Sequence, residues 1–412
     1  MRNPTLKRAT GNWVVGDQFW DREVELSLFM ERLNEGAHLL LTAPRRIGKT
    51  SLLKEVARRL AGNCLCLYID LQKAESAADA VVELSLASHE YKPAWNRILS
   101  MFQNALRETV ETVKIRDLSV VLRGGLTADN WRSKGDELLE ILAEQDQPVA
   151  LFLDEVAILV NRLLRGSDYI ITDQRRQEVD AFLSWRRKHP PSRQDQTGRH
   201  RIDRIGASRS PGRAQRHSEH VHAVPPWTLD PRRREWLSQG PLPSDGYALL
   251  LHPDAIEEML ERLGVYIPHH VQMFFDHVYQ EARLAETSEA SVALVREVYH
   301  RSMLGIRGHV ELSHMEERLK TVLGPELDSL ALDLLTEAAV TGSLTGETAR
   351  LLALCHSPEE WTTPLRDVLD ILQHDGYLGC RDGVYSFASA LLKDWWEARF
   401  RFAYIPAAKR RQ

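Results

Sequence analysis

Two short clusters of residues carry the chemistry open to this sequence. Gly48-Lys49-Thr50 follows an apolar run and opens a segment with helical composition. Further along the chain, a second apolar run ends in Asp154 and Glu155. A lysine and a hydroxyl at a helix N-terminus can bind a phosphate and its Mg²⁺. Of two adjacent acids, one can bind the metal and the other can act as a general base. The two clusters together indicate a site for a nucleoside triphosphate.

The first cluster lies where a predicted strand passes through a loop into a predicted helix. The run Leu39–Leu41 and the periodic apolar residues after Thr50 give the context that a phosphate-binding loop (P-loop) requires. Lys49 would reach the β- and γ-phosphates, while the Thr50 hydroxyl would bind Mg²⁺. Ala43 stands where the first glycine is expected, so the loop must begin with negative φ or under strain. The loop residues expected to bind ATP are Ala43, Pro44, Arg45, Arg46, Ile47, Gly48, Lys49, Thr50 and Ser51.

The second cluster ends the strand-like run Val149–Leu153, whose start is marked by Gln147-Pro148. Ligands of open α/β sheets bind at the carboxyl ends of the strands, so both acids are expected at the edge of the sheet where a ligand would bind. Asp154 would hold the Mg²⁺ shell, and Glu155 would polarise the attacking water as the catalytic base, with Lys49 as the second catalytic residue. An apolar run that ends in Asp-Glu is common, and its place downstream of a phosphate loop is what favours a Walker B motif.

The other patterns of the first half outline the elements around these clusters. Phe19 to Asn34 has helical spacing, and Cys64 to Leu71 has the composition of a buried strand. Asp70 ends that strand, and a solvated carboxylate is favoured there over a metal ligand. Further along, the patterns predict helices within 74–114 and from Trp131 to Glu144, and a short alternating strand from Leu118 to Leu126.

Composition and charge restrict the class of protein. With 412 residues, 43% hydrophobic and 27% charged, the chain is long enough for two or three domains with sizeable cores. A net charge of −5 argues against a protein that coats nucleic acid along its whole surface. No apolar run approaches membrane-spanning length, so we expect a cytoplasmic protein that makes no membrane contact. The cysteines have neither paired nor zinc-like spacing, which favours reduced thiols at Cys64, Cys66, Cys355 and Cys380.

Three segments resemble the archaeal-type ATPase family: Phe19-x-x-Arg22-Glu23-x-Glu25, Pro44–Leu53 and Leu153-Asp154-Glu155. Members are P-loop proteins related to the AAA+ and STAND groups and occur also in bacteria. The resemblance implies an α/β fold, a P-loop NTPase parallel sheet with helices on both faces and one strand between the P-loop and Walker B strands. It also implies adenine near Phe19 and Arg22, and Glu155 as catalytic base. The Arg45-Arg46 pair belongs to the family pattern, as either a phosphate-proximal or a solvated pair.

In the resembling family a helical lid and a winged-helix domain follow the ATPase core. Three amphipathic segments fit a lid, namely Pro253 to Leu263, Pro268 to Leu284 and Ala290 to Met303. The turn before Pro268 resembles the family's second sensor region, where His269 or His270 could approach nucleotide, although a helix cap and a core histidine are the favoured alternative. We expect an ATPase core at 1–236, a lid at 237–309 and a winged-helix-like domain at 310–412.

The C-terminal part has the element order of a winged helix and the wrong charge for DNA. Alternating residues around Arg381-Asp382-Gly383 predict a hairpin. The span 310–404 holds 8 Lys and Arg against 16 Asp and Glu, a net charge of −8. The candidate reading helix, Pro364 to His374, contains Asp367 and Asp370. Since DNA affinity rests on phosphate neutralisation by cations, this domain is expected to bind a protein partner, and DNA is disfavoured.

The stretch 189–224 differs from the rest of the chain. Its only aliphatic residues larger than Ala are Ile202, Ile205, Val221 and Val224, and it has no Phe, Trp or Tyr. The family would place an apolar sensor strand here, and no such strand is visible. The alternatives are a disordered insertion and a pair of compensating frameshifts, and both predict irregular structure. Translating the gene in all three frames is the test, because the frameshift hypothesis fails if no frame yields an apolar strand followed by a Gly-Ser-Ile-Gly-like turn.

Three functions remain open from the sequence. The first is a Mg²⁺-dependent ATPase whose nucleotide state is coupled to the C-terminal interaction domain. The second is a STAND-like nucleotide switch with little turnover, and the third is a winged-helix DNA-binding regulator. The first two share one site, so the residues do not separate them, and oligomerisation is also left open.

Overall fold

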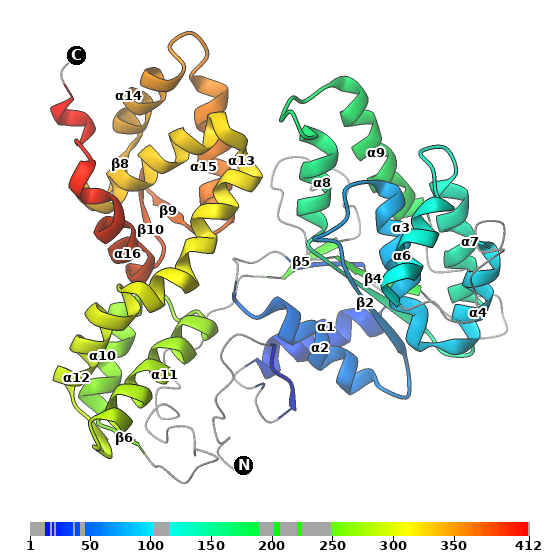
Figure 1. Ribbon diagram of the computed structural model, residues 1–412, viewed down its shortest axis with the longest axis horizontal. Coiled ribbons are helices and arrows are strands. Elements are labelled where there is room, and N and C mark those ends of the chain that lie inside the picture. Colours follow the sequence, from blue (N-terminus) through cyan, green and yellow to red (C-terminus); the bar gives the residue numbers. More distant parts are fainter. Residues whose placement is uncertain are drawn as a thin grey trace.

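The computed structural model describes residues 13–16, 19, 22–35, 38–41, 46–102, 115–188, 202–206, 221–224 and 249–410. These residues form two lobes (Figure 1), a core lobe up to residue 224 and a helical lobe from residue 249. The core lobe is built on a five-stranded parallel sheet with the order β2-β3-β4-β1-β5. Its strands are β1 (His38–Leu41), β2 (Leu65–Asp70), β3 (Val149–Asp154), β4 (Ile202–Gly206) and β5 (Val221–Val224).

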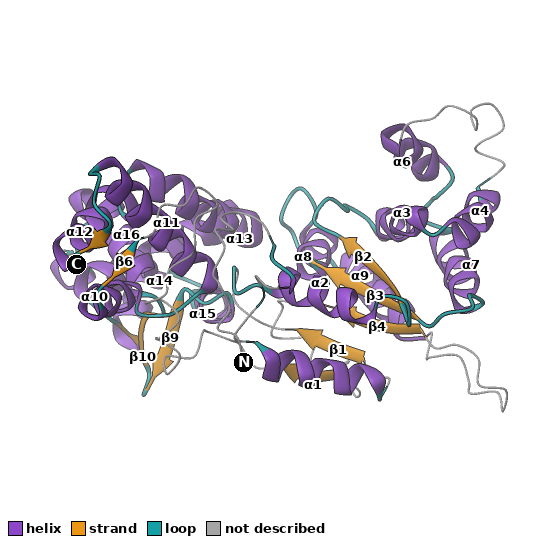
Figure 2. Cartoon of the chain, turned by 90° about the horizontal axis from the view of Figure 1, so that it is seen from below, coloured by secondary structure: helices purple, strands orange, loops and turns teal. Residues whose placement is uncertain are grey.

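Helices cover both faces of this sheet, as the resemblance implies (Figure 2). Alternate residues of β3 face opposite sides: Ala150 and Phe152 pack with α1 and α2, while Val149 and Leu151 pack with the remaining helices. This alternation follows from the pleat of a strand that is buried on both faces. The helices of the core lobe are α1 (Glu23–Asn34), α2 (Lys49–Leu60), α3 (Ala77–Ala87), η2 (Ser88–Glu90), α4 (Lys92–Met101), α6 (Ile115–Gly124), α7 (Trp131–Ala143), α8 (Val156–Arg165) and α9 (Asp173–Lys188).

The strand predicted from Leu118 to Leu126 is wrong, because residues 118–124 lie in helix α6 and the last two residues are outside any strand. In a strand, residues 118, 120 and 122 would share one face. Instead Leu122 is fully buried while Val120 is 69% exposed. Leu118 and Leu122, spaced by four residues, both pack on the apolar cluster, which is the spacing of a helix face.

The expectation of irregular structure across 189–224 is wrong for two short segments. Residues 202–206 form β4 and residues 221–224 form β5. β4 pairs with β1 on one side and β3 on the other, so a strand does lie between the P-loop and Walker B strands. The rest of the stretch lies outside the described residues, and the frameshift hypothesis stays a prediction.

The helical lobe starts with the predicted lid helices. α10 (Pro253–Leu263) and α11 (Pro268–Leu284) have the predicted bounds, since each begins with Pro in its first turn and α10 ends before Gly264, whose φ is 70°. The third segment divides into α12 (Val292–Val298) and a π-helical turn η5 (Tyr299–Met303). Two short strands, β6 (Leu250–Leu251) and β7 (Glu289–Ala290), pair in parallel beside them.

The C-terminal part continues from α13 (Ile306–Thr341), which is kinked at Gly324 before Pro325. The predicted hairpin is confirmed: Asp382 and Gly383 take positive φ in a two-residue turn between two strands. One apolar core runs from Leu249 to Trp396, so the expected lid and C-terminal units share a core. The elements are β8 (Leu344–Thr345), α14 (Gly346–His356), α15 (Thr362–His374), β9 (Leu378–Arg381), β10 (Val384–Phe387), α16 (Ala390–Phe400), η6 (Arg401–Ala403) and η7 (Ala407–Lys409), with the antiparallel order β8-β10-β9. Within the described ranges, no helix is both long and apolar enough to cross a membrane.

Candidate nucleotide-binding site

The end of β1 and the start of α2 form the two ends of the phosphate loop. Ala43, Pro44 and Arg45 lie outside the described residues. Gly48 precedes α2 with φ 88°, and a Cβ there would meet Arg22 Nη1 at 2.8 Å, so glycine is required. The first turn of α2 has no side-chain cap and no acidic residue, which leaves the helix N-terminus suited to an anion.

The predicted loop residues occupy different surroundings. Lys49 is 7% exposed at the start of α2. Ile47 is buried, so its side chain supports the loop and only its backbone could serve a phosphate. The Ser51 hydroxyl accepts a hydrogen bond from Val14 N at 3.1 Å and thereby ties the N-terminal segment to α2. Sequence reasoning gave Lys49 its own role at the phosphates and did not separate Ile47 and Ser51 from the other loop residues.

Phe19 and Arg22, the residues that the resemblance connects with adenine, lie beside α2. Arg22 donates from Nη1 to Gly48 O at 3.2 Å and is 6% exposed. Phe19 is buried in the apolar cluster that α1 and α2 form with β1. The structure therefore brings Arg22 to the loop and Phe19 to the cluster beside α2, and their contact with adenine stays a prediction.

The Asp154 carboxylate is fixed at the carboxyl end of β3 by three hydrogen bonds. Its Oδ2 accepts from the Thr50 hydroxyl at 3.0 Å and from the Tyr68 hydroxyl at 2.5 Å. Its Oδ1 accepts from Glu155 N at 2.9 Å. The two residues predicted to bind Mg²⁺ thus touch each other. All three donors are neutral, so a buried carboxylate beside a threonine hydroxyl fits a divalent cation with oxygen ligands.

Tyr68 is a site residue that sequence reasoning missed. Burial raises the pKa of the Tyr68 phenol, and the neighbouring Asp154 carboxylate raises it further, so the hydroxyl is a donor at neutral pH. Asp70 pairs in register with Asp154 but is exposed, and its Oδ1 accepts from Gln72 N at 2.9 Å. That placement agrees with the favoured interpretation of a solvated carboxylate.

Glu155 stands at the end of β3 with a backbone that few non-glycine residues adopt. Its φ of 54° and ψ of 30° are left-handed, and it directly precedes α8. Such conformations are held at functional sites when the surrounding structure imposes them. The Glu155 side chain is partly exposed at the carboxyl end of β3, beside Asp154.

Arg46 links the phosphate loop to the helical lobe. Its Nη1 donates to Glu311 Oε2 at 2.8 Å and also contacts His269 Nε2, and its Nη2 lies 3.4 Å from His314 Nδ1. The hydrogen bond from Arg46 lowers the pKa of Glu311. Burial, with the Arg46 charge, lowers the pKa of His269 to about 4, so this ring is neutral at pH 7. His270 is buried instead, as a core histidine would be.

A second contact joins the lobes at the kink of α13. Asn161 Nδ2 donates to Val322 O and Arg165 Nη1 donates to Leu323 O, each at 3.2 Å. Gly324 has φ 78°, and a Cβ there would meet the Tyr169 ring at 2.6 Å. Because α8 begins directly after Glu155, the helix that follows the candidate base holds the kinked helix of the other lobe.

Comparison with known proteins identifies the fold class of this chain. No family model and no curated protein matches the chain. A Walker-type ATPase of Pyrococcus abyssi is similar in structure, with a TM-score of 0.58 and 16% identity over 93% of this chain and 98% of that one.

Two further structures match more weakly. The ORC2 protein of Aeropyrum pernix, in ADPNP–ADP complexes, matches with a TM-score of 0.47 and 13% identity, over 92% of this chain and 94% of that one. The RuvB Holliday junction branch migration motor of Thermotoga maritima matches with a TM-score of 0.40 and 13% identity, over 89% and 90% of the two chains. The fold is therefore assigned from the similarity to the Pyrococcus abyssi protein and from the sheet order β2-β3-β4-β1-β5. The chain has the fold of a Walker-type P-loop ATPase.

Proposed function

We propose that this protein is an ATP-binding, Mg²⁺-dependent ATPase, related to the archaeal-type and AAA+ ATPases, whose nucleotide state is coupled to its C-terminal part. One observation carries the proposal. The Thr50 hydroxyl and the Asp154 carboxylate meet at 3.0 Å, between the N-terminus of α2 and the left-handed Glu155. This is the arrangement of metal ligands and base that phosphoryl transfer to water needs.

Each residue has a separate role in this proposal. Lys49 neutralises the β- and γ-phosphates at the helix N-terminus. Thr50 and Asp154 hold Mg²⁺, which, when bound, offsets charge that develops on the phosphate oxygens. Glu155 takes a proton from the attacking water as a general base. Phe19 and Arg22 line the adenine side.

The coupling is supported by the contacts that join the lobes. Arg46 belongs to the phosphate loop, yet its guanidinium is held by Glu311 and His269 of the helical lobe. A bound phosphate would compete with the Glu311 carboxylate for the same guanidinium, since Arg favours both kinds of anion. Nucleotide would thus loosen one contact, while α8 keeps its hold on the kink of α13.

Glu311→Gln should tighten ATP binding about 1.4- to fivefold, because partly exposed ion pairs contribute about 0.2–1 kcal/mol. The side chain of Glu311 is 39% exposed. Glu316→Gln is the matched control, since Glu316 lies on the same helix and pairs with Arg399 at 2.9 Å, away from the loop. Equal dissociation constants for wild type and Glu311→Gln in calorimetry would contradict the competition.

The same contact supports a second candidate, a STAND-like switch that turns over ATP rarely. A contact between the phosphate loop and the other lobe allows nucleotide to shift the balance between two arrangements, as such a switch requires. The two candidates differ only in turnover. Steady-state phosphate release by the wild type, compared with Lys49→Ala, separates them.

The C-terminal part is proposed as a winged-helix-like protein-contact module. The order α13, β8, α14, α15, β9, β10, with its three-stranded antiparallel sheet, supports that interpretation. Asp367 on α15 is about half exposed, in keeping with an acidic face. A protein partner fits a net charge of −8 over 310–404 better than DNA does.

The full chain should therefore show no salt-steep binding to random duplex DNA. The full chain is used because the lid and the C-terminal part share one apolar core. Fluorescence anisotropy at about 0.05 and 0.2 M salt is the measurement, since a basic surface loses affinity steeply over that range. Submicromolar affinity that falls with salt would revive the DNA-binding regulator.

A further inference from the structure

The hydroxyl of Tyr68 is placed on the carboxylate that would hold the metal. It donates to Asp154 Oδ2 at 2.5 Å, the same oxygen that accepts from Thr50 at 3.0 Å. Glu155 N holds the other oxygen at 2.9 Å. The carboxylate thus accepts hydrogen bonds from a residue of β2, from a residue of α2 and from the residue that precedes α8. Among these donors, only the Thr50 hydroxyl is itself expected to turn towards Mg²⁺.

The sheet register explains how a residue on a different strand reaches this carboxylate. Tyr68 pairs with Phe152, two residues before Asp154 along β3. Tyr68 and Phe152 pack on the apolar cluster of α2, whereas Leu67 and Ile69 pack on the opposite face. By the same alternation Asp154 projects to the α2 side. A tyrosine is long enough to span the remaining two residues, where a shorter polar side chain would fall short.

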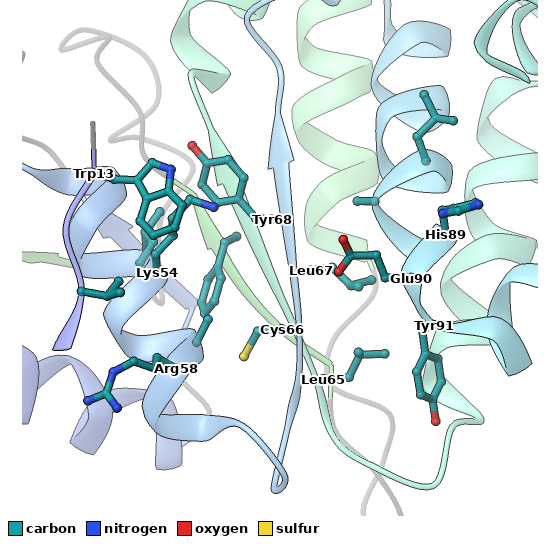
Figure 3. A pocket seen from close by; sticks show the side chains of 16 residues that line it. Trp13, Lys54, Arg58, Leu65, Cys66, Leu67, Tyr68, His89, Glu90 and Tyr91 are labelled. Atoms are coloured by element: carbon teal, nitrogen blue, oxygen red, sulfur yellow. The ribbon is translucent and has the colours of Figure 1, made fainter. Parts of the chain in front are cut away.

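The Tyr68 ring is itself held in place, in a groove of about 850 Å³ beside β2 (Figure 3). Lys54 Nζ lies 4.6 Å from the centre of the Tyr68 ring and 4.5 Å from that of Trp13. A cation between two aromatic faces stabilises both rings. Since Lys54 comes from α2, the helix of the phosphate loop fixes the ring that orients the metal ligand.

We propose that Tyr68 is a positioning residue that orients the Asp154 carboxylate for Mg²⁺ through its hydroxyl. The inference rests on the proposed function, because it assumes that Mg²⁺ accompanies ATP at Asp154. Hydrogen bonds to metal-binding carboxylates fix their orientation, and losing such a partner typically lowers metal affinity about 10–100-fold. When the Thr50 hydroxyl turns to the metal, Tyr68 is the side-chain donor that remains on Asp154.

Tyr68→Phe tests this directly, because it keeps the ring and its stack with Lys54 and removes only the hydroxyl. The dissociation constant of ATP is measured by calorimetry with Mg²⁺ and with excess EDTA. We expect the wild-type value in EDTA and about tenfold less tightening by Mg²⁺. Tyr91→Phe is the matched control, since Tyr91 lines the same groove with no role at Asp154. It should behave as wild type in both buffers.

The outcomes separate this inference from the proposed function. Full tightening by Mg²⁺ in Tyr68→Phe would overturn the inference and leave the function intact, provided that Asp154→Asn loses the tightening. An equal loss of affinity in both buffers would also overturn it, because a general structural role weakens binding without regard to the metal. No tightening by Mg²⁺ in the wild type would contradict the proposed function itself, and the role of Tyr68 with it.

Discussion

We expect Lys49→Ala to abolish tight ATP binding. The lysine is 7% exposed at the first residue of α2, so its charge acts on the phosphates with little screening by water. Charge-assisted contacts of this kind are the strongest that a phosphate site offers. Calorimetric titration with ATP and Mg²⁺ should show at least a hundredfold loss of affinity, about 2.8 kcal/mol at 1.4 kcal/mol per factor of ten.

Arg59→Ala is the control for this loss, because it removes one positive charge from the far end of the same helix. Arg59 pairs with Glu55 at 2.9 Å and is 45% exposed. Its affinity for ATP should stay at the wild-type value. Binding that is equally tight in Lys49→Ala and wild type would remove the phosphate-loop assignment.

Glu155→Gln should keep ATP binding and lose turnover. Gln preserves the shape of the side chain but accepts no proton from water, and general base catalysis typically contributes about 10²–10⁴-fold to the rate. The expected result is an unchanged dissociation constant with phosphate release slowed by that factor. Glu144→Gln, at the exposed end of α7, is the control. Release at the wild-type rate from Glu155→Gln would show that another group is the base.

Local signals predicted the site residues that lie close together in sequence. The loop before α2 and the acids after β3 were found because each follows a short apolar strand, and parallel strands end at one edge. Two of the three helices expected for a lid, α10 and α11, have the predicted bounds because Pro253, Pro268 and Gly264 mark helix ends by their backbone geometry.

Contacts between distant segments could not be predicted. Tyr68 and Asp154 are 86 residues apart, and Arg46 and Glu311 are 265 residues apart. No local pattern records such pairs, and an aromatic residue in a strand is normally a core residue. α6 was missed because a short apolar segment fits alternation and helical spacing about equally well. β4 was missed because its sequence, Ile202–Gly206, mixes charged and apolar residues where an apolar strand was expected.

Steady-state release of phosphate from ATP, with Mg²⁺ and with excess EDTA, measures whether this protein hydrolyses ATP at the proposed site. We expect release by the wild type that depends on Mg²⁺, falls to background in Lys49→Ala, and is slowed by orders of magnitude in Glu155→Gln. Wild-type release that is no faster than that of Lys49→Ala would contradict the claim that this protein is an ATPase.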